Sequence, residues 1–94
     1  MLHVISARYL SHYTINLSFS DGRQGEADLS AIVNNGVFTS LKDIDLFSKF
    51  SVDVELDTVV WSNGLDLAPE FLYYAAFKDD PTLRSQFQTW GYIS

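Results

Sequence analysis

The sequence predicts an α+β domain in which an antiparallel β-meander and a β-hairpin pack with short helices and two C-terminal helices. The first observation is that apolar and polar residues alternate along residues 13–29, around a single turn signal, as they do in antiparallel strands. The second is that residues 69–90 carry apolar side chains at helical spacing. The order of the elements lacks the regular strand–helix alternation of a parallel sheet, which favours an antiparallel one.

Three segments predict the meander. Residues 13–20 have the most regular alternation in the chain, so one face of this strand should be buried. Asp21 and Gly22 follow, and this pair tolerates the backbone of a two-residue hairpin turn. Residues 24–29 alternate again and predict the return strand, while residues 2–9 are rich enough in branched side chains to predict a third strand.

Two short helical pieces are predicted after the meander. The apolar residues within 29–33 have helical spacing, and residues 34–36 end this turn because Asn and Gly accept left-handed backbone. The second piece covers residues 44–49, with Asp43 as its cap. Helices this short are unstable alone, so both pieces should pack on the sheet.

A second hairpin is predicted in the middle of the chain. Val52, Val54 and Leu56 alternate with charged residues, which indicates one strand, and residues 58–61 indicate its partner. The link at Asp57 and Thr58 does not have the composition of an ideal turn, so we expect a tight or irregular connection.

The chain ends in two predicted helices. Pro69 suits the first helical position and Glu70 complements the helix dipole there, so a helix should begin at this point and run through residues 71–77, which are apolar on nearly every side. Asp80 and Pro81 then predict the start of a last helix. The apolar face of this helix consists of Leu83, Phe87 and Trp90, and the helix should end at Gly91. We expect residues 1–78 to form a single α+β domain, and residues 79–94 a C-terminal helical extension packed on the same domain or on a partner.

Composition limits the classes of function. The 94 residues contain no cysteine, which excludes disulfides and Cys-ligated metal sites, and we expect no cofactor and no metal. The N-terminus does not resemble a signal peptide and no apolar run has the length of a membrane span, so a cytoplasmic location is expected. The net charge is −6 and the basic residues are scattered, which predicts no direct nucleic-acid binding by this chain alone. These basic residues are Arg8, Arg23, Lys42, Lys49, Lys78 and Arg84.

Several segments together resemble a known family. They are Phe19-Ser20-Asp21-Gly22-Arg23, Ala27-Asp28-Leu29, Gly36-Val37-Phe38, Leu41-Lys42-Asp43 with Phe47, and Trp61-Ser62-Asn63-Gly64-Leu65-Asp66-Leu67-Ala68-Pro69-Glu70 with Leu72-Tyr73. In this order they resemble the bacterial domain-of-unknown-function 2442 family, over residues 2–78 of this chain. The last block is the most distinctive of them.

The resemblance implies a small α+β domain without an assigned cofactor or catalytic set. Some members of the family are fused to a helix-turn-helix segment that binds DNA, and some are encoded beside another small protein in what look like toxin–antitoxin pairs. Because no helix-turn-helix segment follows the shared core here, we do not expect the DNA-binding role to carry over. An antitoxin-like role needs only a binding surface.

The block of residues 61–70 is one candidate site, for a cation or an amine. Trp61, Asn63, Asp66 and Glu70 would place polar groups beside an aromatic floor. The alternative is structural: Asn63 forms the turn, Asp66 bonds to backbone N–H groups at the start of the helix, and Trp61 fills the core. The structural alternative is the stronger of the two.

The C-terminal helices are the second candidate site, for a protein. A helix that is apolar on every side must be covered on every side, by this chain or by another. The candidate interface residues are Tyr73, Tyr74, Phe77, Phe87, Trp90 and Tyr92.

No catalytic constellation is present in the sequence. His3 and His12 are nine residues apart, a spacing that does not pair two metal ligands on one element. The leading hypothesis is therefore a non-enzymatic protein-interaction module, either an antitoxin-like protein or an accessory subunit, with a second copy or a small protein as its partner. The alternative is a ligand-binding or enzymatic domain that uses Asn63, Asp66 and Glu70.

Overall fold

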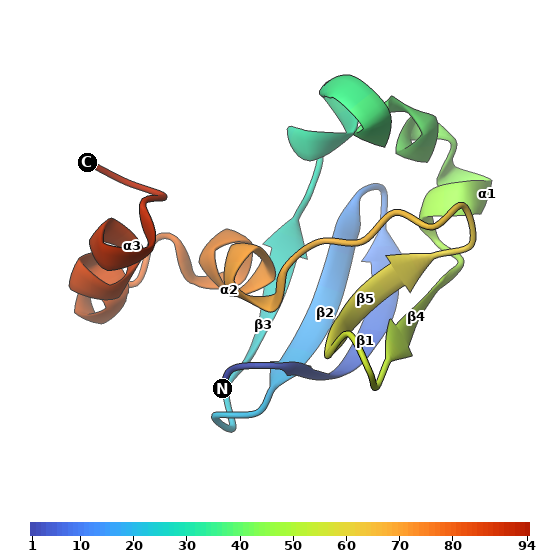
Figure 1. The fold of residues 1–94 in the computed structure, drawn as a ribbon. Helices are drawn as coiled ribbons and strands as arrows, with labels where there is room; N and C mark the ends of the chain where they lie inside the picture. The colour runs from blue at the N-terminus through green and yellow to red at the C-terminus, as the bar shows by residue number, and fades with distance from the viewer.

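A three-stranded antiparallel sheet carries the core in the computed structural model, which describes residues 1–94. Its strands are β1 (Val4–Ser11), β2 (Thr14–Phe19) and β3 (Gln24–Asp28), with β2 in the centre (Figure 1). Ile15, Leu17 and Phe19 of β2 are buried, whereas the residues between them are not. The predicted meander and its buried face are therefore confirmed.

The remaining elements follow in the predicted order. They are the 3₁₀ helices η1 (Ile32–Asn34) and η2 (Gly36–Lys42), helix α1 (Ile44–Phe47), the hairpin of β4 (Phe50–Asp53) and β5 (Thr58–Trp61), helix α2 (Pro69–Phe77), the 3₁₀ helix η3 (Pro81–Leu83) and helix α3 (Arg84–Trp90). Two antiparallel sheets with short helices and two C-terminal helices confirm the α+β class. No helix combines the length and the apolar character needed to cross a membrane.

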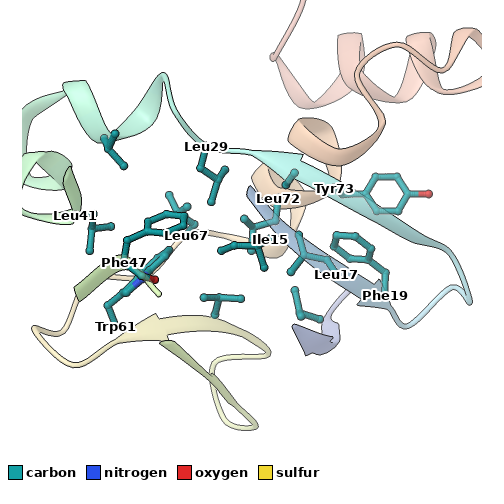
Figure 2. Close-up of a cluster of buried hydrophobic side chains, with 14 of the residues drawn as sticks. Ile15, Leu17, Phe19, Leu29, Leu41, Phe47, Trp61, Leu67, Leu72 and Tyr73 are labelled. Atoms are coloured by element: carbon teal, nitrogen blue, oxygen red, sulfur yellow. The ribbon is translucent and has the colours of Figure 1, made fainter. Parts of the chain in front are cut away.

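One face of the three-stranded sheet contacts the rest of the molecule. Strand register places Ile15 opposite Ala27, and Leu17 opposite Gly25, on this face. The close-up in Figure 2 shows the core side chains of β2 lying between the hairpin and α2. At one end of this core the indole N–H of Trp61 donates a hydrogen bond of 2.8 Å to the carbonyl of Phe47, which fixes α1 against β5.

The predicted strand through Val54 and Leu56 is wrong. Strand β4 ends at Asp53, because one carboxylate oxygen of Asp53 accepts hydrogen bonds from the amides of Glu55 and Leu56, at 2.8 and 3.1 Å. Val54 is 85% exposed and Leu56 is 52% exposed. The link is irregular, as expected, with Asp57 at a φ of +60°.

Two further features differ from the prediction. The hairpin between β2 and β3 has a link of residues 20–23 rather than two residues, in which the carbonyl of Phe19 accepts from the amide of Gly22. The first helical piece, η1, ends at Asn34, as residues 34–36 predicted, but the additional 3₁₀ helix η2 begins at Gly36 and was not predicted. A 3₁₀ helix has three residues per turn and is usually short, so its apolar residues do not produce the spacing that identifies an α-helix. The sequence therefore has no clear pattern for η2.

Gly25 allows α2 to approach β3 closely. A Cβ atom built at Gly25 would lie 2.7 Å from Cε1 of Phe77 and 3.4 Å from Cβ of Ala76. The ring of Phe77 is itself packed against Phe19 and Tyr73, at centroid distances of 5.8 and 4.8 Å.

The substitution Gly25→Ala should therefore lower the free energy of unfolding by about 1–3 kcal/mol, because the Phe77 ring must leave its packed position. Urea unfolding of both proteins measures the change. Glu26→Ala is the matched control, since Glu26 is exposed on the same strand, and it should change the value by less than about 0.5 kcal/mol. Equal effects of the two substitutions would contradict the close approach.

Candidate functional site

Helix α3 covers one side of α2, and the two helices bring the candidate interface residues together. Phe87 is 1% exposed, and its ring lies 5.1 Å from that of Tyr74 and 6.3 Å from that of Tyr73. Trp90 lies 6.0 Å from Tyr73, and Tyr92 stacks on Tyr74 at 5.1 Å. These rings and Phe77 form one aromatic cluster. Tyr73 and Phe87 are its buried members, and the other four are half-buried.

The local sequence explains how α3 reaches this position (Figure 1). Asp80 caps η3 by accepting from the amide of Thr82 at 2.9 Å, and Pro81 follows at the first helical position, both as predicted. Gly91 ends α3 with a φ of +85°, a left-handed conformation that favours glycine. The chain turns there, and this turn brings Tyr92 back onto α2.

A polar network joins this end of the molecule to the β2–β3 link. The hydroxyl of Tyr73 donates to Oδ2 of Asp21 at 2.7 Å. The guanidinium of Arg23 lies between two carboxylates, with Nε 3.8 Å from Asp21 and Nη1 3.3 Å from Asp80. The link between the first hairpin strands is thus tied both to α2 and to the connection that precedes α3.

The network changes the acidity of its members. Burial raises the pKa of Tyr73 to about 12, and the hydrogen bond to Asp21 adds to this effect. Burial also opposes ionisation of Asp21, but the hydrogen bonds from Tyr73 and Arg23 outweigh it and hold the pKa of Asp21 below its usual value. At neutral pH the network therefore contains a protonated phenol and a charged carboxylate.

The junction at residues 61–70 is mainly structural. Trp61 is buried. Asn63 donates to Oγ of Ser40 at 3.1 Å and accepts from the amide of Leu65 at 3.2 Å, so its side chain holds the turn. Gly64 has a φ of +88°, which suits its place in this turn.

The predictions for the two carboxylates of the junction have different outcomes. The predicted role of Asp66 at the start of the helix is wrong, because Ala68 is the N-terminal cap of α2 and no side chain bonds to the free amides there. Glu70 lies in the first turn, as predicted. Glu70 is half-buried. Burial of Tyr92 raises the pKa of its phenol, and the negative charge of Glu70 raises this pKa further.

Three hollows lie around α2 and α3, and Trp61, Asn63, Asp66 and Glu70 line none of them. The Trp90 hollow, of about 220 Å³, is lined by Leu2, Asp21, Tyr73, Leu83, Gln86 and Trp90. The α2 groove, of about 290 Å³, is lined by Asp28, Leu29, Ala31, Ile32, Phe71, Tyr74, Ala75 and Lys78. The Lys78 hollow, of about 230 Å³, is lined by Lys78, Asp79, Asp80, Pro81, Arg84 and Ile93. Several of these residues are far apart in the sequence, and no pattern in the chain connects them.

Comparison with protein families identifies the group of proteins to which this domain is related. Residues 4–78 match the model of a family described as protein of unknown function (DUF2442). The chain belongs to this family. The match ends directly after α2, so η3 and α3 of this DUF2442 protein lie outside it. No curated protein matches the chain.

The fold of this DUF2442 protein also occurs in a solved structure. A crystal structure from Nitrosomonas europaea, of a protein described as a "putative DNA binding protein", is similar with a TM-score of 0.75. The two sequences are 14% identical, so the likeness shows the fold alone. The match covers 100% of this chain and 63% of that chain, so this chain spans less than two thirds of its neighbour.

This neighbour corrects the expectation that the chain alone does not bind nucleic acid. The same fold, over the whole length of this chain, is part of a protein described as a "putative DNA binding protein". The exclusion was based on the scattered basic residues and on the net charge of −6. The exclusion is wrong because net charge determines only the non-specific attraction to phosphates, and says nothing of the fold that this chain shares with its neighbour.

The substitution Tyr73→Phe should lower the free energy of unfolding by about 1 kcal/mol, since it removes the hydroxyl that donates to Asp21. In the wild type, stability should also fall between pH 10.0 and about 12, where the unfolded chain ionises Tyr73 and the folded chain does not. This part of the pH dependence should be absent from Tyr73→Phe. Denaturant unfolding at several pH values measures both effects.

Tyr74→Phe is the matched control, because no hydrogen bond of its hydroxyl is present in the structure. It should leave the stability at neutral pH close to the wild-type value. Identical behaviour of the two variants would contradict the Tyr73–Asp21 hydrogen bond.

Proposed function

We propose that this DUF2442 chain is a non-enzymatic protein-interaction module that binds a small basic protein through the α2 groove. In this role it would be an antitoxin-like protein or an accessory subunit. The observation that carries the proposal is the groove itself. Although α3 covers one side of α2, an apolar channel remains open between α2 and η1, and six of its eight lining residues are hydrophobic. Apolar channels of this kind accept side chains of a partner.

The charges of the chain favour a basic partner over a second copy. The net charge is −6, so two copies would repel each other, whereas a basic protein would be attracted. At the rim of the groove the backbone amide of Ser30 donates to Asp28 and holds the pKa of this carboxyl below its usual value. Asp28 is therefore charged at neutral pH and offers a contact for a basic residue.

Two observations support the non-enzymatic part of the proposal. The carboxylates of Asp66 and Glu70 line no hollow, so they do not face a space where a substrate could bind. The phenol of Tyr73 does line one, but a pKa of about 12 keeps it protonated and unsuited to act as a base at neutral pH.

Affinity purification of the tagged chain from its host tests the proposal. Ala31 is exposed at the rim of the groove, so the longer and positively charged side chain of Ala31→Lys should obstruct the groove and repel a basic partner without disturbing the core, and the partner should be lost from the purified fraction. Ser51→Lys adds the same charge at an exposed position of β4 and is the matched control, which should retain the partner. Thermal unfolding should show that both variants are folded.

Two outcomes would contradict the proposal. Equal recovery of a partner with Ala31→Lys would show that the groove is not the binding surface. A doubled molecular mass of the purified wild type in light scattering, lost in Ala31→Lys alone, would identify a second copy as the occupant of the groove.

DNA binding is the second candidate, and the shared fold of the putative DNA binding protein is the observation that favours it. Lys78 and Arg84 line the same hollow, together with Asp79 and Asp80, so they are the pair of cations to test for contact with a phosphate backbone. If the chain binds DNA, labelled mixed-sequence duplex should show increased fluorescence anisotropy in low salt, and added salt should weaken binding as counterions compete. The double substitution of Lys78 and Arg84 by Gln should abolish the increase, while that of Lys42 and Lys49 should not. No increase with the wild type at low salt would remove this candidate.

A further inference from the structure

We propose that the Trp90 hollow binds the guanidinium or ammonium group of a basic side chain. The inference deepens the proposed function and rests on it in one respect, namely that the partner protein supplies this side chain. The Trp90 hollow is separate from the α2 groove, and Tyr73, Trp90 and Asp21 provide its chemistry.

The walls of the hollow suit the shape of an arginine or lysine side chain. The rings of Tyr73 and Trp90 meet edge to face, with centroids 6.0 Å apart and planes at 74°. A cation above the face of either ring is attracted by its quadrupole. Leu2 and Leu83 complete the apolar part of the lining, and apolar surface of this kind contacts the aliphatic stem of a basic residue.

The size of the hollow favours a single side chain over a whole metabolite. Its volume is about 220 Å³. Sites for small molecules usually measure about 300–1,000 Å³, so this hollow lies below their range. A side chain delivered by a protein partner needs less enclosure, because the rest of the interface holds it in place.

Asp21 supplies the charge. Its Oδ1 accepts from the amide of Arg23 at 2.9 Å and its Oδ2 accepts from Tyr73 at 2.7 Å, which fixes the orientation of the carboxylate. Each oxygen can accept a further hydrogen bond, and the side chain remains 36% exposed. A fixed, charged and accessible acceptor therefore lies at the edge of an aromatic hollow.

Arg23 does not neutralise this site. Its guanidinium lies 3.3 Å from Asp80 but 3.8 Å from Asp21, so it is shared between the two carboxylates. Two carboxylates and one guanidinium leave one negative charge. An incoming cation would balance it, whereas an anion or a neutral group would not.

Titration of the isotope-labelled full chain with short blocked peptides tests the inference by nuclear magnetic resonance. The probes are acetyl-Leu-Arg-Leu-amide, acetyl-Leu-Lys-Leu-amide and the neutral acetyl-Leu-Gln-Leu-amide. The Arg and Lys peptides should shift the indole N–H resonance of Trp90, and the Gln peptide should not. The indole of Trp61 is an internal control, because it is buried and bonded to Phe47.

The substitution Asp21→Asn should weaken binding of the Arg and Lys peptides by about tenfold, since it removes the charge but keeps an oxygen that can accept from Tyr73. Asp66→Asn is the matched control, with the same change of charge at an exposed position outside the hollow, and it should leave the affinity unchanged. Binding to the wild type should also weaken with added sodium chloride. Thermal unfolding of Asp21→Asn reports on its fold, and the salt dependence of the wild type tests for electrostatic attraction without any substitution.

Three results would overturn the inference: no shift of Trp90 with either basic peptide, equal shifts with the Gln peptide, or affinity that does not respond to salt. These failures differ from a failure of the proposed function. Shifts of Trp90 together with unchanged partner capture by Ala31→Lys would remove the α2 groove and leave this inference standing. Partner capture that depends on Ala31, with no peptide shift, would do the opposite.

Discussion

The need to cover most of the apolar surface of α2 determines the arrangement of the C-terminal half. The side chains of residues 71–77 are buried or half-buried, although the sheet can contact only one side of a helix. Burial of one large apolar side chain stabilises a protein by about 1.5–3 kcal/mol, and small domains have a net stability of about 5–15 kcal/mol. A few uncovered side chains on α2 would therefore remove much of the stability of this chain. Gly25 of β3 allows close contact on one side, and Phe87 of α3 fills the other.

The regular parts of the fold could be predicted because local pattern and tertiary burial agree there. The alternation in β2, the proline that begins α2 and the glycine that ends α3 each act through near neighbours in the chain. The prediction failed where a local hydrogen bond competes with the pattern. Val54 continues the alternation that is typical of a strand. However, the Asp53 carboxylate accepts hydrogen bonds from two backbone amides, and β4 ends at Asp53.

The candidate site could be predicted only in part, for a physical reason. The six aromatic residues were identified as a set from local information, because five of them lie on the two predicted helices and Tyr92 follows directly after. Their arrangement as a cluster within one chain depends on the turn at Gly91 and on the contact of α3 with α2. The Trp90 hollow combines the N-terminus, the β2–β3 link and both C-terminal helices, so no local pattern could indicate it. Asp21 has the sequence of an ordinary turn residue, and only the structure places it beside Tyr73.

Asp21 connects the stability of the fold with its proposed chemistry. Its carboxylate accepts a hydrogen bond from Tyr73 and forms an ion pair with Arg23. Arg23 also pairs with Asp80, which caps the 3₁₀ helix that leads into α3. A cation in the Trp90 hollow would interact with the ionised form of Asp21, which is also the form that accepts from Tyr73. A ligand that binds only the folded state stabilises that state. Because Trp90 and Gln86 belong to α3, a basic side chain in the hollow would also hold α3 against α2. The same contact would then recognise a partner and strengthen the cover that α2 requires.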